Sequence, residues 1–162
     1  MTKKQHPIGS GFTAGSTAAE VVEGIDLSGR NVIVTAGHVG LGLETTRALA
    51  NAGANVVVAS RNPATATAAL SGIGGIGGIG AIGGIGGIGG IEVDQLDLID
   101  PASVESFAER YRDSGRPLHI LINNAGLMSG DLVRDPRGYE QQFRHQPPRP
   151  LPADTRAAVC AA

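Results

Sequence analysis

The chain contains four short runs in which apolar residues follow one another instead of alternating with polar ones. These runs are 31–36 (NVIVTA), 55–59 (NVVVA), 91–96 (IEVDQL) and 118–123 (LHILIN). Consecutive apolar and β-branched residues are typical of parallel strands that are buried on both faces of a sheet. We therefore predict four buried strands.

Segments of helical character separate these runs. Helices are predicted over about 43–52, 63–70 and 101–112, with Gly53 and Gly115 as stop signals after the first and the third. Such alternation of strands and helices predicts an α/β fold, a Rossmann-type doubly wound parallel sheet. With about four strands the sheet is incomplete. Its predicted order is 3-2-1-4, which leaves the fourth strand as an apolar edge.

Composition divides the chain into three parts. Residues 1–30 are predicted to be an N-terminal extension with one short helix, in which Thr17 and Glu20 have the spacing of a capping box. Residues 31–126 are predicted to form the Rossmann domain. Residues 127–162, where Pro and Arg are prominent, are predicted to be a non-globular tail.

A low-complexity tract over residues 72–90 interrupts the predicted domain. Isoleucine recurs there at every third position among glycines, a period that fits neither the alternation of a strand nor the turn of an α-helix. We predict a flexible surface insert between a helix and a strand that carries no chemistry.

Charge and cysteine content limit the classes of partner. With 13 Lys and Arg against 15 Asp and Glu, the chain has no basic excess that would favour nucleic acid or an anionic membrane. The apolar stretches are shorter than the roughly 20 residues that span a bilayer. Cys160 is the single cysteine, and the N-terminus lacks the apolar core of a secretory signal. We expect a cytoplasmic protein with a small-molecule partner and without a metal site.

Residues 35–42 (TAGHVGLG) form a glycine-rich turn between the first predicted strand and a helix. Glycines in such a turn let the backbone approach a pyrophosphate, and the positive end of the helix stabilises the anion. Contacts with a dinucleotide are predicted from Thr35, Gly37, His38, Gly40, Leu41 and Gly42. A tight turn without a ligand is the alternative. For His38 we expect a capping or solvent-facing role and no catalytic role.

The end of the second predicted strand reads Ser60-Arg61-Asn62. A site selective for NAD usually offers Asp or Glu there to the 2′-hydroxyl of the ribose. A guanidinium instead favours a 2′-phosphate, so NADP(H) is the expected cofactor, in preference to NAD(H). A solvated surface arginine is the alternative reading.

These features together resemble the short-chain dehydrogenases/reductases, whose glycine motif is TGxxxGxG. Further matches are Asp97-Leu98 after the third strand and the NNAG sequence at 123–126. Residues 16–29 and 43–62 are similar to retinol dehydrogenase-like and WW-domain oxidoreductase-like members. The resemblance covers about residues 8–143. It implies that Asp97 and Leu98 lie at the adenine, that Asn124, Ala125 and Gly126 belong to the cofactor site, and that the reaction interconverts an alcohol and a carbonyl.

Two departures from the family pattern stand out. Ala36 occupies the first glycine of the motif, which would cost about 1 kcal/mol if that position requires a positive φ. The family transfers its proton through a Tyr followed four residues later by a Lys, but the lysines here are Lys3 and Lys4. We therefore predict no catalytic residue, and a truncated, inactive chain.

The sequence of the Pro- and Arg-rich tail has two interpretations. Residues 144–155 (RHQPPRPLPADT) are compatible with codons that, read one nucleotide later, give ATNHLGHFQLT, a string that resembles the family. This indicates a frameshift near Phe143. Alternatively, Arg144, Pro147 and Pro150 match an SH3 ligand, which binds as a polyproline II helix. The competing functions are thus an enzyme completed by another chain, an NADP(H)-binding pseudoenzyme and an SH3 ligand.

Overall fold

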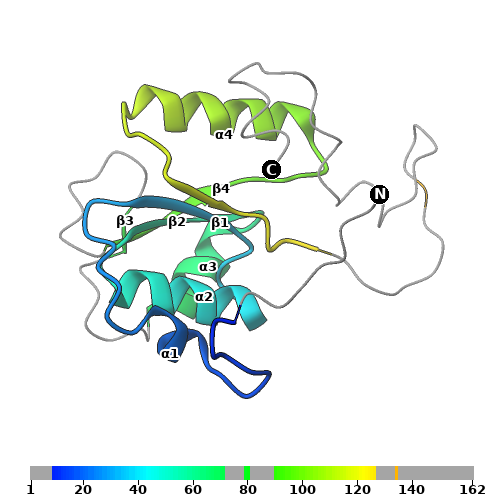
Figure 1. Ribbon diagram of the computed structural model, residues 1–162. Coiled ribbons are helices and arrows are strands. Elements are labelled where there is room, and N and C mark those ends of the chain that lie inside the picture. Colours follow the sequence, from blue (N-terminus) through cyan, green and yellow to red (C-terminus); the bar gives the residue numbers. More distant parts are fainter. Residues whose placement is uncertain (1–8, 72–78, 81–89, 127–133, 135–162) are drawn as a thin grey trace, which may run out of the picture.

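The computed structural model describes residues 9–71, 79–80, 90–126 and 134. Figure 1 draws the other residues as a thin grey trace. The predicted tail, with its SH3-type motif and the proposed frameshift position, lies outside the described residues except for Arg134, as does most of the Ile-Gly tract. The division of the chain at residues 30 and 126 stays a prediction.

Within the described residues, five parallel strands form one sheet in the order β3-β4-β2-β1-β5. The strands are β1 (Asn31–Thr35), β2 (Asn55–Ser60), β3 (Ile79–Gly80), β4 (Ile91–Gln95) and β5 (Ile120–Ile122). The four predicted strands correspond to β1, β2, β4 and β5. Their predicted order, 3-2-1-4, is therefore confirmed together with the α/β class.

The short strand β3 was not expected. The tract was predicted to form neither strand nor helix, and at Ile79–Gly80 this is wrong, because these residues pair in parallel with Ile91 and Glu92 of β4. Pairing of this kind uses backbone N–H and C=O groups and does not require alternating side chains. The free edge of β4 thus recruits a segment whose side-chain pattern gives no strand signal.

Helices cover both faces of the sheet (Figure 1). They are α1 (Ala18–Val22), α2 (Gly40–Asn51), α3 (Pro63–Leu70) and α4 (Pro101–Asp113). Helix α4 lies on one face, whereas α2 and α3 lie on the other with α1 outside α2. Helix α2 begins three residues before its predicted start because the glycine turn leads directly into it. The predicted capping box of α1 is confirmed, since both reciprocal bonds between Thr17 and Glu20 are present.

Each face of the sheet has its own hydrophobic cluster. Val32 and Val34 point to one face and pack with Leu49 of α2. Ile33 and Val57 point to the other face and pack with Phe107 of α4. All five residues of β1 are buried, as expected for a strand in the middle of a sheet that is covered on both sides.

Strand β5 differs from its prediction. Residues 118–123 were expected to be a buried strand, but the strand comprises only Ile120–Ile122, and all three are half-buried. Within the described part of the chain, β5 pairs only with β1 and forms the edge of the sheet. A run of apolar residues predicts a buried strand. It does not show whether neighbouring elements pack against both sides of that strand.

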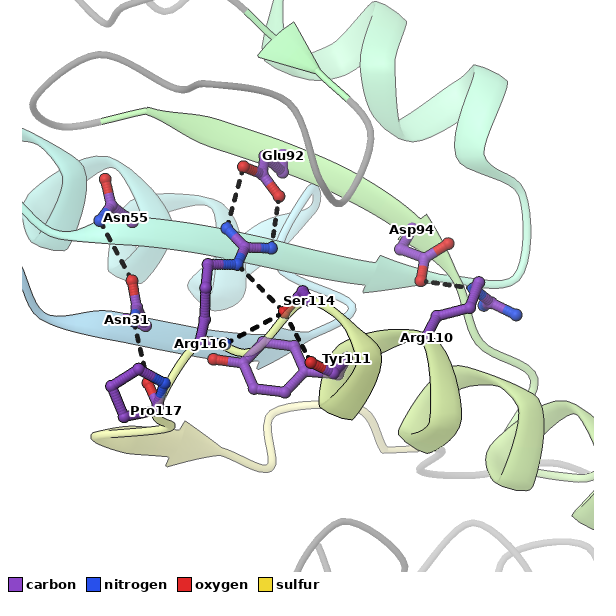
Figure 2. Close-up of polar contacts among 9 residues, drawn as sticks. All are labelled: Asn31, Asn55, Glu92, Asp94, Arg110, Tyr111, Ser114, Arg116 and Pro117. Carbon is purple, nitrogen blue, oxygen red and sulfur yellow. Dashed lines mark hydrogen bonds and ion pairs between the residues drawn. The ribbon is translucent and has the colours of Figure 1, made fainter.

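Polar contacts hold the loop before β5 against the sheet (Figure 2). Arg116 donates two hydrogen bonds, of 3.0 and 2.9 Å, to the carboxylate of Glu92 on β4. The Nδ2 of Asn31 donates to the carbonyl of Pro117 at 2.9 Å. Glu92 is only 6% exposed, so its charge is compensated inside the fold by a bidentate partner.

Candidate functional site

A cavity of about 330 Å³ opens at the carboxyl ends of the strands. It lies where the chain leaves β1 between its neighbours β2 and β5, the position at which doubly wound sheets bind ligands. Nine residues predicted from the sequence line it: Thr35, His38, Ser60, Arg61, Asn62, Asp97, Leu98, Ala125 and Gly126. The fold therefore brings together four sequence segments that lie far apart along the chain.

Other predicted residues do not line the cavity, although they are close in sequence to residues that do. These are Gly37, Gly40, Leu41, Gly42 and Asn124. Gly40, Leu41 and Gly42 form the first turn of α2, where backbone N–H groups lack partners within the helix. The cavity is also lined by residues that the sequence reading did not select, among them Val39, Ala59, Thr65 and Leu96.

Ala36 has the backbone conformation that its position in the motif suggested. Its φ is +52°, the only positive φ at a non-glycine residue in the described part of the chain. An L-amino acid in the left-handed region has its Cβ too close to the following carbonyl oxygen. The turn therefore carries strain at a residue that also lines the cavity.

Two glycines of the turn are needed for close approach. A Cβ on Gly37 would lie 2.6 Å from Oγ1 of Thr46 and 3.0 Å from the Cβ of Val34. A Cβ on Gly42 would collide with the side-chain amide of Asn124 and lie 2.7 Å from the carbonyl oxygen of Ala36. Both positions leave no room for a side chain.

Asn124 joins the end of β5 to the glycine turn. Its Nδ2 donates to the carbonyl of Thr35 at 3.0 Å and to that of Ala36 at 3.3 Å. The N–H of Ala125 donates to the hydroxyl of Thr35 at 2.9 Å. The Thr35 hydroxyl and the Asn124 amide are thus occupied in fixing the floor of the cavity.

At the end of β2, the arginine side chain of Arg61 lies beside the start of helix α3. Asn62 caps α3, since its Oδ1 accepts from the N–H of Thr65 at 3.2 Å. The hydroxyl of Ser60 accepts from the N–H of Asn62 at 3.3 Å. Arg61 is exposed, and its guanidinium forms no hydrogen bond or ion pair with any described residue. Positive charge and the positive end of a helix therefore meet at this side of the cavity.

Asp97 shapes the turn that presents Leu98. Its Oδ1 accepts from the N–H of Ile99 at 2.9 Å, and its own N–H donates to the hydroxyl of Ser103 at 2.9 Å. One carboxylate oxygen thus organises the local backbone, while Asp97 and Leu98 both line the cavity.

His38 does not behave as expected. It was predicted to cap the turn or face solvent, but the residue is half-buried and its Nδ1 is enclosed without a hydrogen-bond partner among the described residues. Burial lowers the pKa of His38 below its ordinary value. Burial therefore favours the neutral form of the imidazole.

The sequence reading also missed Thr46, which is fully buried on α2 and donates from Oγ1 to the carbonyl of Gly37 at 2.8 Å. A signal was available: Thr46 lies on the same helical face as Leu49 and Ala50, three and four residues later. A polar residue on such a face needs a hydrogen-bond partner.

The described residues contain no group of three or more His, Cys, Asp or Glu side chains that could hold a metal ion. Among these residues there is also no helix of the length and apolar character needed to cross a membrane.

Comparison with known proteins identifies relatives of the chain. A family model described as short chain dehydrogenase matches residues 30–141. A Streptomyces antibioticus protein named "Probable oxidoreductase" is 44% identical over 120 residues, which cover 74% of this chain and 36% of that protein. The WW domain-containing oxidoreductase of Gallus gallus is 32% identical over 133 residues, covering 82% of this chain and 30% of that protein. The chain thus spans about a third of the length of these relatives.

Solved structures of other proteins are also similar to this chain. An uncharacterised protein of Mycobacterium paratuberculosis superimposes with a TM-score of 0.61 at 32% identity, covering 82% of this chain and 42% of that one. A metagenomic short-chain oxidoreductase in complex with NADP has a TM-score of 0.50 at 27% identity, covering 62% of this chain and 41% of that one.

Proposed function

This chain belongs to the short-chain dehydrogenase family, and from that premise we propose that its cavity binds the adenosine end of a nicotinamide dinucleotide. The cavity lies at the switch point of the sheet and is lined by the glycine turn, the end of β2 and the turn after β4. A dinucleotide supplies a hydride donor or acceptor when bound. The residues here hold its phosphates, ribose and base.

The backbone fits an anionic ligand. The N–H groups of His38 and Val39 form no hydrogen bond with described residues, although both residues line the cavity. Unpaired N–H groups before a helix N-terminus favour a phosphate. Leu96 and Leu98 provide an apolar wall for the adenine, and Asp97 stands between them.

The observation that carries the choice of cofactor is the unpaired guanidinium of Arg61 at the cavity. An acidic residue at the end of β2 would repel a 2′-phosphate, whereas an arginine attracts it. We therefore propose NADP(H) in preference to NAD(H). The metagenomic relative in complex with NADP supports this proposal.

Titration of the chain with NADPH and with NADH tests both the binding of a dinucleotide and the preference for NADP(H). NADPH is expected to bind more tightly, and Arg61→Ala is expected to weaken NADPH by about ten- to a hundredfold, the range of a hydrogen bond to a charged group. NADH should change by less than about threefold. Arg112→Ala is the matched control, because it removes an exposed arginine of α4 that does not line the cavity. Equal affinity for the two dinucleotides would refute the preference for NADP(H).

We propose that the reaction of the family is the interconversion of an alcohol and a carbonyl. In this proposal the 162 residues bind the cofactor but do not transfer a proton. Neither Tyr111 nor Tyr139 is followed by a lysine four residues later. We accordingly propose that the chain on its own binds the cofactor without turnover. Measurement of NADPH oxidation with a panel of carbonyl compounds tests this, and any turnover above the rate without protein would contradict it.

The shifted reading frame near residue 143 is likewise a proposal. It rests on the family-like string that the alternative frame allows over residues 144–155. Sequencing the gene through this region tests it: the codons must give ATNHLGHFQLT one nucleotide later, and any other string would overturn the proposal.

A further inference from the structure

Thr46 lies beneath the glycine turn with its side chain fully enclosed. Its relative exposure is 0%, and its hydroxyl donates to the carbonyl of Gly37 at 2.8 Å. A buried hydroxyl destabilises a fold unless it is hydrogen-bonded, so this contact is maintained in the folded chain. Thr46 thus fixes one carbonyl of the turn from below.

Gly37 and Thr46 fit each other as a pair. A Cβ at Gly37 would come within 2.6 Å of the Thr46 hydroxyl, so the carbonyl can approach the hydroxyl only because residue 37 has no side chain. Gly37 has a negative φ, since it is absent from the residues with positive φ. Close approach to Thr46, rather than a special backbone conformation, explains this glycine.

The orientation of the Gly37 carbonyl determines that of the next N–H. A peptide group is planar and trans, so its C=O and N–H point in opposite directions. The carbonyl of Gly37 points to Thr46 on α2, and the N–H of His38 therefore points away from α2. That N–H forms no hydrogen bond with described residues, and His38 lines the cavity together with Arg61.

We propose that Thr46 is a positioning residue that directs the His38 N–H towards the ribose 2′-phosphate of the bound dinucleotide. The inference rests on the proposed function, because it needs a dinucleotide in the cavity. Thr46 itself does not touch the ligand. It acts through the Gly37 peptide, and the phosphate is then shared between the His38 amide and the Arg61 guanidinium.

The test compares Thr46→Val and Thr46→Ser in titrations with NADPH and with NADH. Valine keeps the shape of threonine and removes the hydroxyl, whereas serine keeps the hydroxyl. Thr46→Val is expected to lower the affinity for NADPH by about three- to tenfold, the range of one neutral hydrogen bond. The affinity for NADH should stay within about twofold of that of the unaltered chain. Thr46→Ser should keep both affinities within about twofold of the unaltered chain.

Thr45→Val is the control on the same helix. The Thr45 hydroxyl donates to the carbonyl of Leu41 at 2.9 Å within α2, and neither residue lines the cavity, so both affinities should stay unchanged. Thermal melts of each variant show whether it is folded. If Thr46→Val does not fold, Thr46→Ala and Thr46→Ser provide the same comparison with a smaller side chain.

Three results would overturn the inference. If Thr46→Val lowered the affinities for NADPH and NADH equally, Thr46 would have a general structural role. Unchanged affinity for both would show that the hydroxyl is not needed for binding. If the unaltered chain binds neither dinucleotide, the proposed function itself fails, and this outcome is separate because it does not depend on any variant.

Discussion

Replacement of Ala36 by glycine should stabilise this protein, although alanine-to-glycine changes usually destabilise. Ala36 has a φ of +52°, where an L-residue is disfavoured by about 1–2 kcal/mol relative to glycine. Glycine gives back about 0.4–1 kcal/mol of this through the greater entropy of its unfolded chain. The expected net gain in the free energy of unfolding is about 0.5–1 kcal/mol.

Urea denaturation followed by circular dichroism measures this gain, and a thermal melt gives a second readout. For a domain of about 100 residues, 1 kcal/mol corresponds to roughly 4–8 °C in Tm. Gly40→Ala is the reverse experiment, because Gly40 has a φ of +53° and a Cβ there would meet nothing within 4 Å. By the same balance it should destabilise by about 0.5–1 kcal/mol.

Ala64→Gly is the matched control. Ala64 is exposed in α3, where glycine is about 1 kcal/mol less favourable than alanine. The same chemical change should thus have opposite signs at residues 36 and 64. If Ala36→Gly lowers stability as Ala64→Gly does, the turn is not strained at Ala36 and the reasoning is wrong.

Three further predictions concern groups away from the turn backbone. Tyr111→Phe should raise the free energy of unfolding by about 1 kcal/mol in urea titration, because the buried hydroxyl of Tyr111 has no hydrogen-bond partner among the described residues; a loss of stability would reveal a partner. Arg116→Met should lower it by about 3 kcal/mol by leaving the carboxylate of Glu92 buried and unpaired, and adding Glu92→Met should restore most of the loss; additive losses would contradict the pairing. Because burial lowers the pKa of His38 from its ordinary value of 6.5, its contribution to stability is complete above pH 6.5 and is lost as pH falls through the lower folded-state pKa. Subtraction of the pH profile of His38→Gln from that of the unaltered chain should isolate this loss, and identical profiles would refute it.

The strands that lie in the middle of the sheet could be predicted from the sequence almost residue by residue. NVIVTA and NVVVA have apolar side chains on both faces, and both faces are covered by helices. Helix α3 has its predicted limits, and in the structure Pro63 lies in its first turn while Asn62 caps it. These signals are local, so they survive without knowledge of the tertiary structure.

Features that depend on distant partners could not be predicted in this way. The pairing of Ile79–Gly80 depends on the free edge of β4, and the partial burial of β5 depends on what lies beyond it. In the site, the glycine motif located the cavity, but it did not reveal that Thr46 supports the turn or that Nδ1 of His38 is enclosed. Such contacts arise only when α2 packs beneath the turn.

The amide of Asn124 sets a condition on the order in which the glycine turn is assembled. Its bonds to the carbonyls of Thr35 and Ala36 connect residues 89 and 88 positions apart in the sequence. During synthesis β1, α2 and β2 leave the ribosome long before residue 124, and closing so long a loop is slow compared with local helix formation. The hydrogen bonds that Asn124 adds to the turn are therefore expected to form late, after the first βαβ unit and only when β5 pairs with β1.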